Sequence, residues 1–367
     1  MTINVLVLGA LMFAVGKMAA ASNVAAANKE AAAAAAALPT TTAVPSGATP
    51  AATEPVASAD SSGIPTVQQF LDPTGKYYGL SAPSFPWSQS TVDKYTLLDG
   101  GVAPNMAEYF LNWTENFQPS TVMDAYSHAE LPVLSWEPWA GGSSILYKAV
   151  GQPAYSLESI IDGAHDAYIT QFAEAVKANK WPIAIRFAHE MNGSWYPWSE
   201  SVNGNKPGQY VAAWRHVHDI FTKVGATNVI WIWSPNVIRG MTSVSLSELY
   251  PGDAYVDWVG ATAYEVTEST AEQVMGPTLK EIRKFTQKPM LITETGGEPN
   301  PEKAAFTASL LAWIPTQPDV LGFVWFEYNG EDGGRTNWTF EGDPNTLKAF
   351  KTGISAYPLA RIPVPPS

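Results

Sequence analysis

Two short segments of the sequence each place a glutamate where an apolar, strand-like run ends. Residues 186–193 read RFAHEMNG and carry Glu190, and residues 291–297 read LITETGG and carry Glu294. Two carboxyl groups in one cleft can cleave a glycosidic bond, because one protonates the leaving oxygen while the other attacks or stabilises the anomeric carbon. The sequence therefore predicts sugar chemistry if the fold brings Glu190 and Glu294 together.

The elements that would position these glutamates are short apolar runs separated by helical patterns. The runs cover residues 77–80, 106–110, 132–136, 182–187, 229–233, 258–263, 290–293 and 322–326. Helical patterns lie between them at 271–285 and 302–313, and the clearest one begins at Pro207 and ends at Gly225. Alternating strands and helices predict a parallel sheet, and eight such units predict one closed (β/α)8 TIM barrel.

In such a barrel the active site lies at the carboxyl ends of the strands. The residues expected there are mostly acids and aromatics with few cations, an inventory that suits a neutral sugar chain. Glu137, Glu265 and Glu327 also follow strand ends, and each could replace one of the two glutamates if a strand register were misread. More simply, they would hydrogen-bond sugars or brace other side chains.

The motifs resemble those of glycoside hydrolase family 26. The resemblance lies in RFAHEMNGSWYPW at 186–198, WIWSPN at 231–236, YPGDAYVDWVGATAY at 250–264 and TETG at 293–296. It extends over roughly residues 77–328. The His-Glu pair followed by Met-Asn-Gly is specific, whereas a Glu-x-Gly at a strand end is weak by itself; together and in this order they are strong.

The resemblance implies a retaining double displacement, with Glu190 as general acid/base after the fourth strand and Glu294 as nucleophile on the seventh. In retaining enzymes the two carboxyl groups lie about 5 to 5.5 Å apart. Apolar neighbours and the charge of Glu294 should raise the pKa of Glu190, so that it starts protonated. Hydrogen bonds should keep Glu294 ionised.

Further site residues follow from the same resemblance. Tyr264 matches a hydroxyl that bonds the nucleophile, His189 matches a sugar-binding residue, and Trp325 matches a tryptophan that floors the subsite beside the cleaved bond. Arg186 is a candidate to hold the Glu294 carboxylate. Asn192 would orient Glu190 or a sugar hydroxyl, or only cap its loop. The tryptophans expected to line neighbouring subsites, with core packing as the alternative, are Trp136, Trp139, Trp195 and Trp198.

The composition limits the possible partners and cofactors. A net charge of −13 argues against nucleic acid or an anionic membrane surface. Cysteine is absent, so thiolate nucleophiles and thiolate metal sites are excluded. His216 and His218 are spaced to point to different sides of a helix, so no metal site is predicted. No cofactor is predicted, and we expect a monomer that binds a polysaccharide.

The substrate remains open between several β-glycans. The family is best known for β-1,4-mannan, and endo-β-1,4-mannanase is the first expectation. The alternative is a mixed-linkage β-1,3-1,4-glucanase, because Trp195-Tyr-Pro-Trp198 differs from the Trp-Phe-Trp-Trp of many mannanases and is closer to the glucanase branch. A reading of another class is a noncatalytic glycan-binding protein on the same barrel, although it would not require both glutamates.

The first residues predict export rather than fold. Residues 1–21 combine an apolar run with small alanines and predict a signal peptide, with retention as an N-terminal anchor as the alternative. Residues 22–63 are rich in Ala, Thr, Pro and Ser and predict a disordered linker. Residues 64–367 are then the catalytic domain of a secreted protein, with tethering to the cell envelope left open.

Overall fold

The computed structural model describes residues 63–141, 150–239, 245–268 and 270–365. The predicted signal peptide and nearly all of the predicted linker lie outside these residues, so both stay predictions. None of the described helices is both long enough and apolar enough to span a bilayer.

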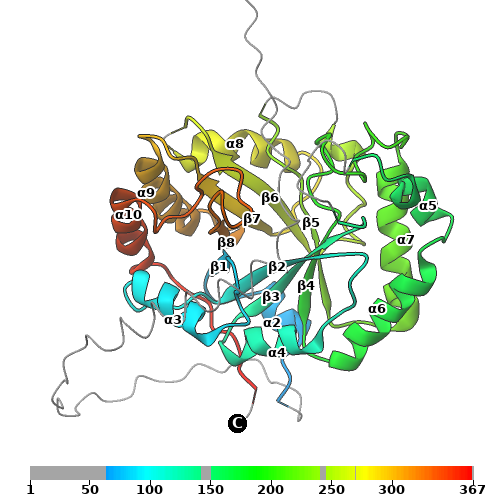
Figure 1. Cartoon of the computed structure of the whole chain (residues 1–367), viewed down its shortest axis with the longest axis horizontal. Helices are drawn as coiled ribbons and strands as arrows, with labels where there is room; N and C mark the ends of the chain where they lie inside the picture. The colour runs from blue at the N-terminus through cyan, green and yellow to red at the C-terminus, as the bar shows by residue number, and fades with distance from the viewer. Residues whose placement is uncertain (1–62, 142–149, 240–244, 269, 366–367) are drawn as a thin grey trace, which may run out of the picture.

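Eight parallel strands form a closed barrel in which each strand pairs with the next and β8 pairs with β1 (Figure 1). The strands are β1 (Tyr77–Ser81), β2 (Met106–Asn112), β3 (Leu131–Glu137), β4 (Ile183–Phe187), β5 (Val229–Trp233), β6 (Trp258–Glu265), β7 (Met290–Gly297) and β8 (Val320–Phe326). Each lies on a run expected from the sequence, so the predicted (β/α)8 barrel is confirmed.

Helices surround the barrel (Figure 1). They are α2 (Val67–Leu71), α3 (Gln89–Leu98), α4 (Pro119–Ser127), α5 (Leu157–Ile161), α6 (Asp166–Asn179), α7 (Gln209–Val224), α8 (Ala271–Ile282), α9 (Lys303–Trp313) and α10 (Pro344–Ile354), with short 3-10 turns at Pro153–Tyr155, Leu246–Glu248 and Ile314–Thr316. The α7 helix ends at Gly225 as predicted, because this residue takes a φ of 80° that favours glycine.

Large aromatic side chains fill the layer between the strands and the helices. The ring of Trp136 on β3 stacks on Phe172 of α6 with centroids 4.4 Å apart. The ring of Trp325 on β8 lies edge-on to Phe350 of α10 at 5.5 Å. Both tryptophans are fully buried. Side chains alternate between the two faces of a strand, and these two tryptophans point outward, toward α6 and α10. Trp136 and Trp325 therefore belong to the core between strands and helices. They do not line the substrate cleft, where the sequence predicts them.

Strand β7 contains one extra residue beside the predicted nucleophile. Leu291 and Glu294 of β7 pair with Gly260 and Thr262 of β6, so three steps along β7 match two along β6. Such a bulge breaks the alternation of side chains. Thr293 and Glu294 can therefore both make hydrogen bonds inside the barrel, although they are consecutive in sequence.

Candidate active site

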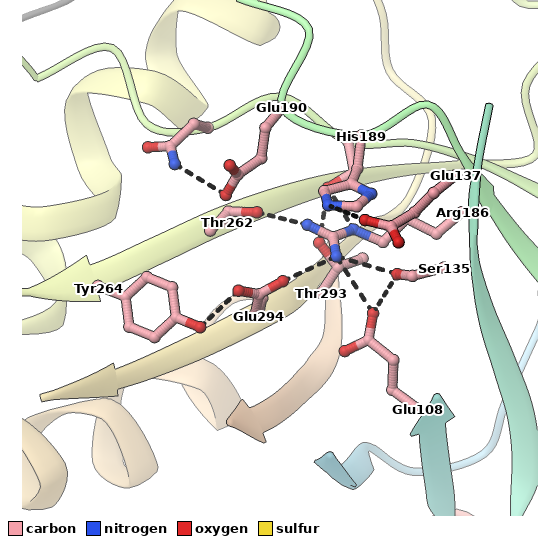
Figure 2. Close-up of polar contacts among 12 residues, drawn as sticks. Glu108, Ser135, Glu137, Arg186, His189, Glu190, Thr262, Tyr264, Thr293 and Glu294 are labelled. Carbon is pink, nitrogen blue, oxygen red and sulfur yellow. Dashed lines mark hydrogen bonds and ion pairs between the residues drawn. The ribbon is translucent and has the colours of Figure 1, made fainter. Parts of the chain in front are cut away.

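Arg186 on β4 is the centre of a buried polar network inside the barrel (Figure 2). Its guanidinium donates hydrogen bonds to Glu108, Ser135, Ser234, Thr262 and Glu294. These partners come from β2, β3, the end of β5, β6 and β7, so one side chain links most of the barrel. A planar guanidinium with five N–H donors suits this role, which an ammonium group could not fill.

Glu294 is held by hydrogen bonds to both of its carboxylate oxygens. Arg186 Nη1 donates to Oε2 over 2.8 Å, and the Tyr264 hydroxyl donates to Oε1 over 2.5 Å. Burial, together with the charge of Glu294, raises the pKa of Tyr264, so its hydroxyl remains a donor. The two donors fix the direction of the Glu294 carboxylate.

Glu190 lies just beyond the end of β4 in an unusual backbone conformation. Its φ is 54°, a region that residues with a Cβ rarely adopt. The backbone N–H of Glu190 donates to the carbonyl of Ser234 over 2.7 Å, which holds this turn. The carboxyl accepts hydrogen bonds from Trp195 Nε1 at 2.6 Å and from Asn236 Nδ2 at 2.9 Å. This strained turn directs the Glu190 carboxyl group toward Trp195 and Asn236.

The amide of Asn192 fixes the residue that binds Glu190. Asn192 Nδ2 donates to the carbonyl of Asn236 over 2.8 Å, and Asn192 Oδ1 accepts from the backbone N–H of Asn236 over 2.9 Å. This two-way pairing joins the loop after β4 to the loop after β5. Asn192 thus orients Glu190 indirectly, through the side chain of Asn236.

The surroundings of Glu190 favour its protonated form. Burial, followed by the negative charge of Glu294, raises the pKa of Glu190 to about 7, while Arg186 and the hydrogen bond from Trp195 oppose the rise. The two carboxyl groups therefore differ in environment: Glu294 forms an ion pair with Arg186, whereas Glu190 accepts hydrogen bonds from neutral side chains. Unequal carboxyl groups of this kind can act as a proton donor and a nucleophile.

Aromatic and acidic side chains form a cluster beside Glu190 and Glu294. His189 Nε2 lies 3.2 Å from the Tyr196 hydroxyl and 4.0 Å from Glu137 Oε1. Burial, and then the charge of Arg186, lowers the pKa of His189, so its imidazole is neutral. Trp198 stacks on Tyr196 with centroids 4.3 Å apart, and its indole donates to the His189 carbonyl. Trp139 Nε1 donates a hydrogen bond to Glu137 Oε2, so Trp139 belongs to the same cluster.

The other acids at strand ends have structural partners. Glu265 accepts a hydrogen bond from the side chain of Asn300. Glu327 accepts hydrogen bonds from the backbone N–H groups of Phe340 and Glu341. Both acids thus hold loops on the rim of the barrel. Neither contacts Glu190 or Glu294 through a hydrogen bond.

Several residues of the network had no role predicted from the sequence: Glu108, Ser135, Tyr196, Ser234, Asn236, Thr262 and Thr293. Glu108 sits inside an apolar strand, where burial raises its pKa while the charge of Arg186 lowers it. A polar side chain inside an apolar run is the signal that could have revealed it, since buried charges in proteins are paired.

The described residues offer no cluster of three or more histidine, aspartate or glutamate side chains arranged to hold a metal ion. The Nε2 atom of His216 lies 2.6 Å from Oδ1 of Asp166 in α6.

A parallel eight-stranded barrel with two unequal carboxyl groups at the carboxyl ends of its strands is an arrangement found in glycoside hydrolases. The chain belongs to glycosyl hydrolase family 26, whose family model matches residues 119–296. That segment contains Arg186, Glu190, Tyr264 and Glu294.

Individual relatives agree with this assignment. Endoglucanase H of Acetivibrio thermocellus is 32% identical over 285 residues, which are 73% of this chain and 29% of that protein. A mannan endo-1,4-beta-mannosidase of Bacillus subtilis strain 168 is 31% identical over 88 residues, which are 23% of each chain. The matched segments therefore cover less than a third of the length of either relative.

Solved structures show the same fold. A Cellulomonas fimi endo-beta-1,4-mannanase double mutant superimposes with a TM-score of 0.60 at 21% identity, over 77% of this chain and 71% of that one. The beta-mannanase BoMan26A of Bacteroides ovatus gives a TM-score of 0.56 at 20% identity, over 78% of this chain and 89% of that one.

Proposed function

We propose that this protein is a retaining, endo-acting β-glycoside hydrolase, with Glu190 as general acid/base and Glu294 as nucleophile. The observation that carries the proposal is the contrast between the two carboxyl groups. Glu294 receives charge-assisted hydrogen bonding from Arg186, whereas burial raises the pKa of Glu190 to about 7.

In the first step Glu190 gives its proton to the glycosidic oxygen while Glu294 attacks the anomeric carbon. The bond from that carbon to the leaving oxygen breaks, and an ester between the sugar and Glu294 forms. Glu294 thereby loses its negative charge. Since that charge helps to raise the pKa of Glu190, the pKa of Glu190 falls in the intermediate.

In the second step Glu190, now ionised, takes a proton from water. The water oxygen attacks the anomeric carbon, the ester bond breaks and the Glu294 carboxylate is restored. The sugar keeps its original anomeric configuration because two inversions have occurred. Arg186 and Tyr264 stay in place throughout and receive the returning charge on Glu294.

For the substrate, we propose a β-glucan with β-1,4 links, including mixed-linkage β-1,3-1,4-glucan. The support is that Endoglucanase H matches over 73% of this chain, whereas mannosidases match over shorter segments. The Trp195-Tyr-Pro-Trp198 segment points the same way. Mannan is the second candidate, because several relatives and the superimposable structures of C. fimi and B. ovatus are named as mannanases.

The test is product analysis of the full chain on mixed-linkage β-glucan, soluble β-1,4-mannan and β-1,3-xylan, with Glu190→Ala and Glu294→Ala as matched variants. Short oligosaccharides from β-glucan that neither variant produces would support the proposal. Products from mannan alone would transfer the assignment to the second candidate. If no polymer is cut and one still retards the protein in an affinity gel, the chain is a glycan-binding protein.

We also propose that the protein is exported and acts as a monomer. The support for export is the apolar run and small residues within 1–21, followed by the polar composition of 22–63. Amino-terminal sequencing of protein from the culture medium tests export, and sedimentation of the secreted form tests its oligomeric state. A protein found only inside cells, or a stable dimer, would contradict these two statements.

A further inference from the structure

Trp338 lies in the loop that follows β8, beside the residues that hold the nucleophile. Its ring centroid is 4.3 Å from that of Tyr264, and its side chain is 4% exposed. Trp338 Cβ and the ring of Tyr264 each lie 3.4 Å from the position that a Cβ on Gly296 would take. Trp338 therefore packs on β6 and β7 at the positions next to the hydrogen bond between Tyr264 and Glu294.

Hydrogen bonds fix the backbone that carries Trp338. Its N–H donates to the carbonyl of Tyr328 over 3.0 Å, and its carbonyl accepts from Trp325 Nε1 over 3.1 Å. Lys303 of α9 donates from Nζ to the carbonyl of Asn337 over 2.9 Å. Trp325, which the sequence placed in the cleft, thus acts from the outer face of the barrel by holding the loop.

A local turn adds to this rigidity. Asn337 Oδ1 accepts hydrogen bonds from the backbone N–H of Thr339 at 3.1 Å and from its hydroxyl at 2.6 Å. An asparagine that bonds the backbone two residues ahead sets the chain direction of a turn. Glu327 then accepts hydrogen bonds from the N–H groups of Phe340 and Glu341. The loop is pinned on both sides of Trp338.

Within the described parts of the chain, the indole of Trp338 makes no hydrogen bond. Its Nε1 is buried and finds no acceptor among the described residues. An unpaired buried donor lowers stability. The position of the Trp338 ring is therefore not explained by a hydrogen bond from its indole to another described residue. The contact that remains is the packing of its flat ring against Tyr264.

We propose that Trp338 is a positioning residue, which holds the Tyr264 ring in the orientation in which its hydroxyl donates to Glu294. This inference rests on the proposed role of Glu294 as nucleophile. The ring of Phe326 lies at 6.1 Å from Tyr264, further than that of Trp338. Without Trp338 the Tyr264 ring gains room to turn, and the carboxylate loses one of its two fixed donors. Small displacements of catalytic groups lower the rate strongly.

The test compares Trp338→Leu, Trp338→Phe, Tyr264→Phe and the double variant Trp338→Leu with Tyr264→Phe. We expect Trp338→Leu to lower kcat by roughly 10-fold, as removal of the Tyr264 hydroxyl does, with little change in KM, and Trp338→Phe to restore most of the loss. In the Tyr264→Phe background, Trp338→Leu should change kcat little further, because the hydroxyl that it positions is already gone. Phe323→Leu is the control for lost packing, since Phe323 packs on Tyr78, Phe350 and Tyr357.

Two outcomes would overturn the inference. The first is an equal loss of kcat in the presence and absence of the Tyr264 hydroxyl. The second is a crystal structure of Trp338→Leu in which the Tyr264 hydroxyl still lies within hydrogen-bond distance of Glu294. The structural readout does not need activity. If the unaltered protein cuts no polymer, the proposed function fails, whereas the placement of Tyr264 by Trp338 is still decided.

Discussion

Replacing Trp195 by phenylalanine removes the indole N–H that donates to Glu190 Oε2 over 2.6 Å. That hydrogen bond favours the ionised form of Glu190 and opposes the rise in pKa caused by burial. A hydrogen bond to a charged group contributes about 1.5 kcal/mol, and about 1.4 kcal/mol corresponds to one pKa unit. We therefore expect the pKa of Glu190 to rise by about one unit in Trp195→Phe.

The assay is the pH dependence of kcat/KM on soluble β-glucan, whose alkaline limb reports ionisation of the general acid in the free enzyme. In the unaltered protein this limb should lie near the Glu190 pKa of about 7. In Trp195→Phe it should move upward by about one pH unit. Tyr196→Phe is the matched control, because its hydroxyl contacts His189 rather than Glu190. A limb that stays in place or moves to lower pH in Trp195→Phe would refute the reasoning.

Three further changes have clear expected results. Arg186→Lys keeps the charge but loses the planar set of donors, so kcat on an activated aryl glycoside should fall by roughly 100-fold or more; an unchanged kcat would show that the network is not needed. Tyr264→Phe should lower kcat by roughly 10-fold and leave KM nearly unchanged, since one donor to Glu294 is lost. Glu130→Leu should raise the free energy of unfolding by about 1 to 3 kcal/mol at pH 8, because both carboxyl oxygens of Glu130 are buried and find no hydrogen-bond partner among the residues that the structure describes. Burial raises the pKa of Glu130 above 4.5 in the folded protein. As the pH rises, the unfolded chain therefore loses this proton at a lower pH than the folded protein does. The stability of the unaltered protein falls as the pH rises above 4.5. The gain from Glu130→Leu, measured by urea unfolding, should therefore be smaller at pH 4 than at pH 8, and equal gains would contradict this account.

The barrel could be predicted from the sequence because its strands are buried on both faces. Such strands form short continuous apolar runs, and helical patterns between them give the alternation of a parallel barrel. The run at 106–110 corresponds to β2 (Met106–Asn112), and the run at 290–293 to the first half of β7 (Met290–Gly297). The same continuity hides which face each side chain takes. The sequence therefore could not show that Ser135 points into the barrel while Trp136 points outward.

The site could be predicted in part, for a related reason. Glu190 and Glu294 stand where apolar runs end in recognisable motifs, and Arg186 belongs to the first of these motifs. Glu108 lies within a strand and reaches the site only because the barrel closes around Arg186. Trp338 is placed by turn and loop hydrogen bonds far along the chain from β6 and β7. Contacts of this kind depend on tertiary structure, which local patterns do not encode.

The most direct test of the two-carboxylate mechanism is to trap the glycosyl-enzyme intermediate. The full chain would be treated with an activated 2-deoxy-2-fluoro β-glycoside of cellobiose or mannobiose, digested with a protease and examined by mass spectrometry. The mechanism predicts one label, attached to Glu294, with none in Glu294→Ala. A label on Glu108, Glu137 or Glu190, or hydrolysis with inverted product and no label, would contradict it.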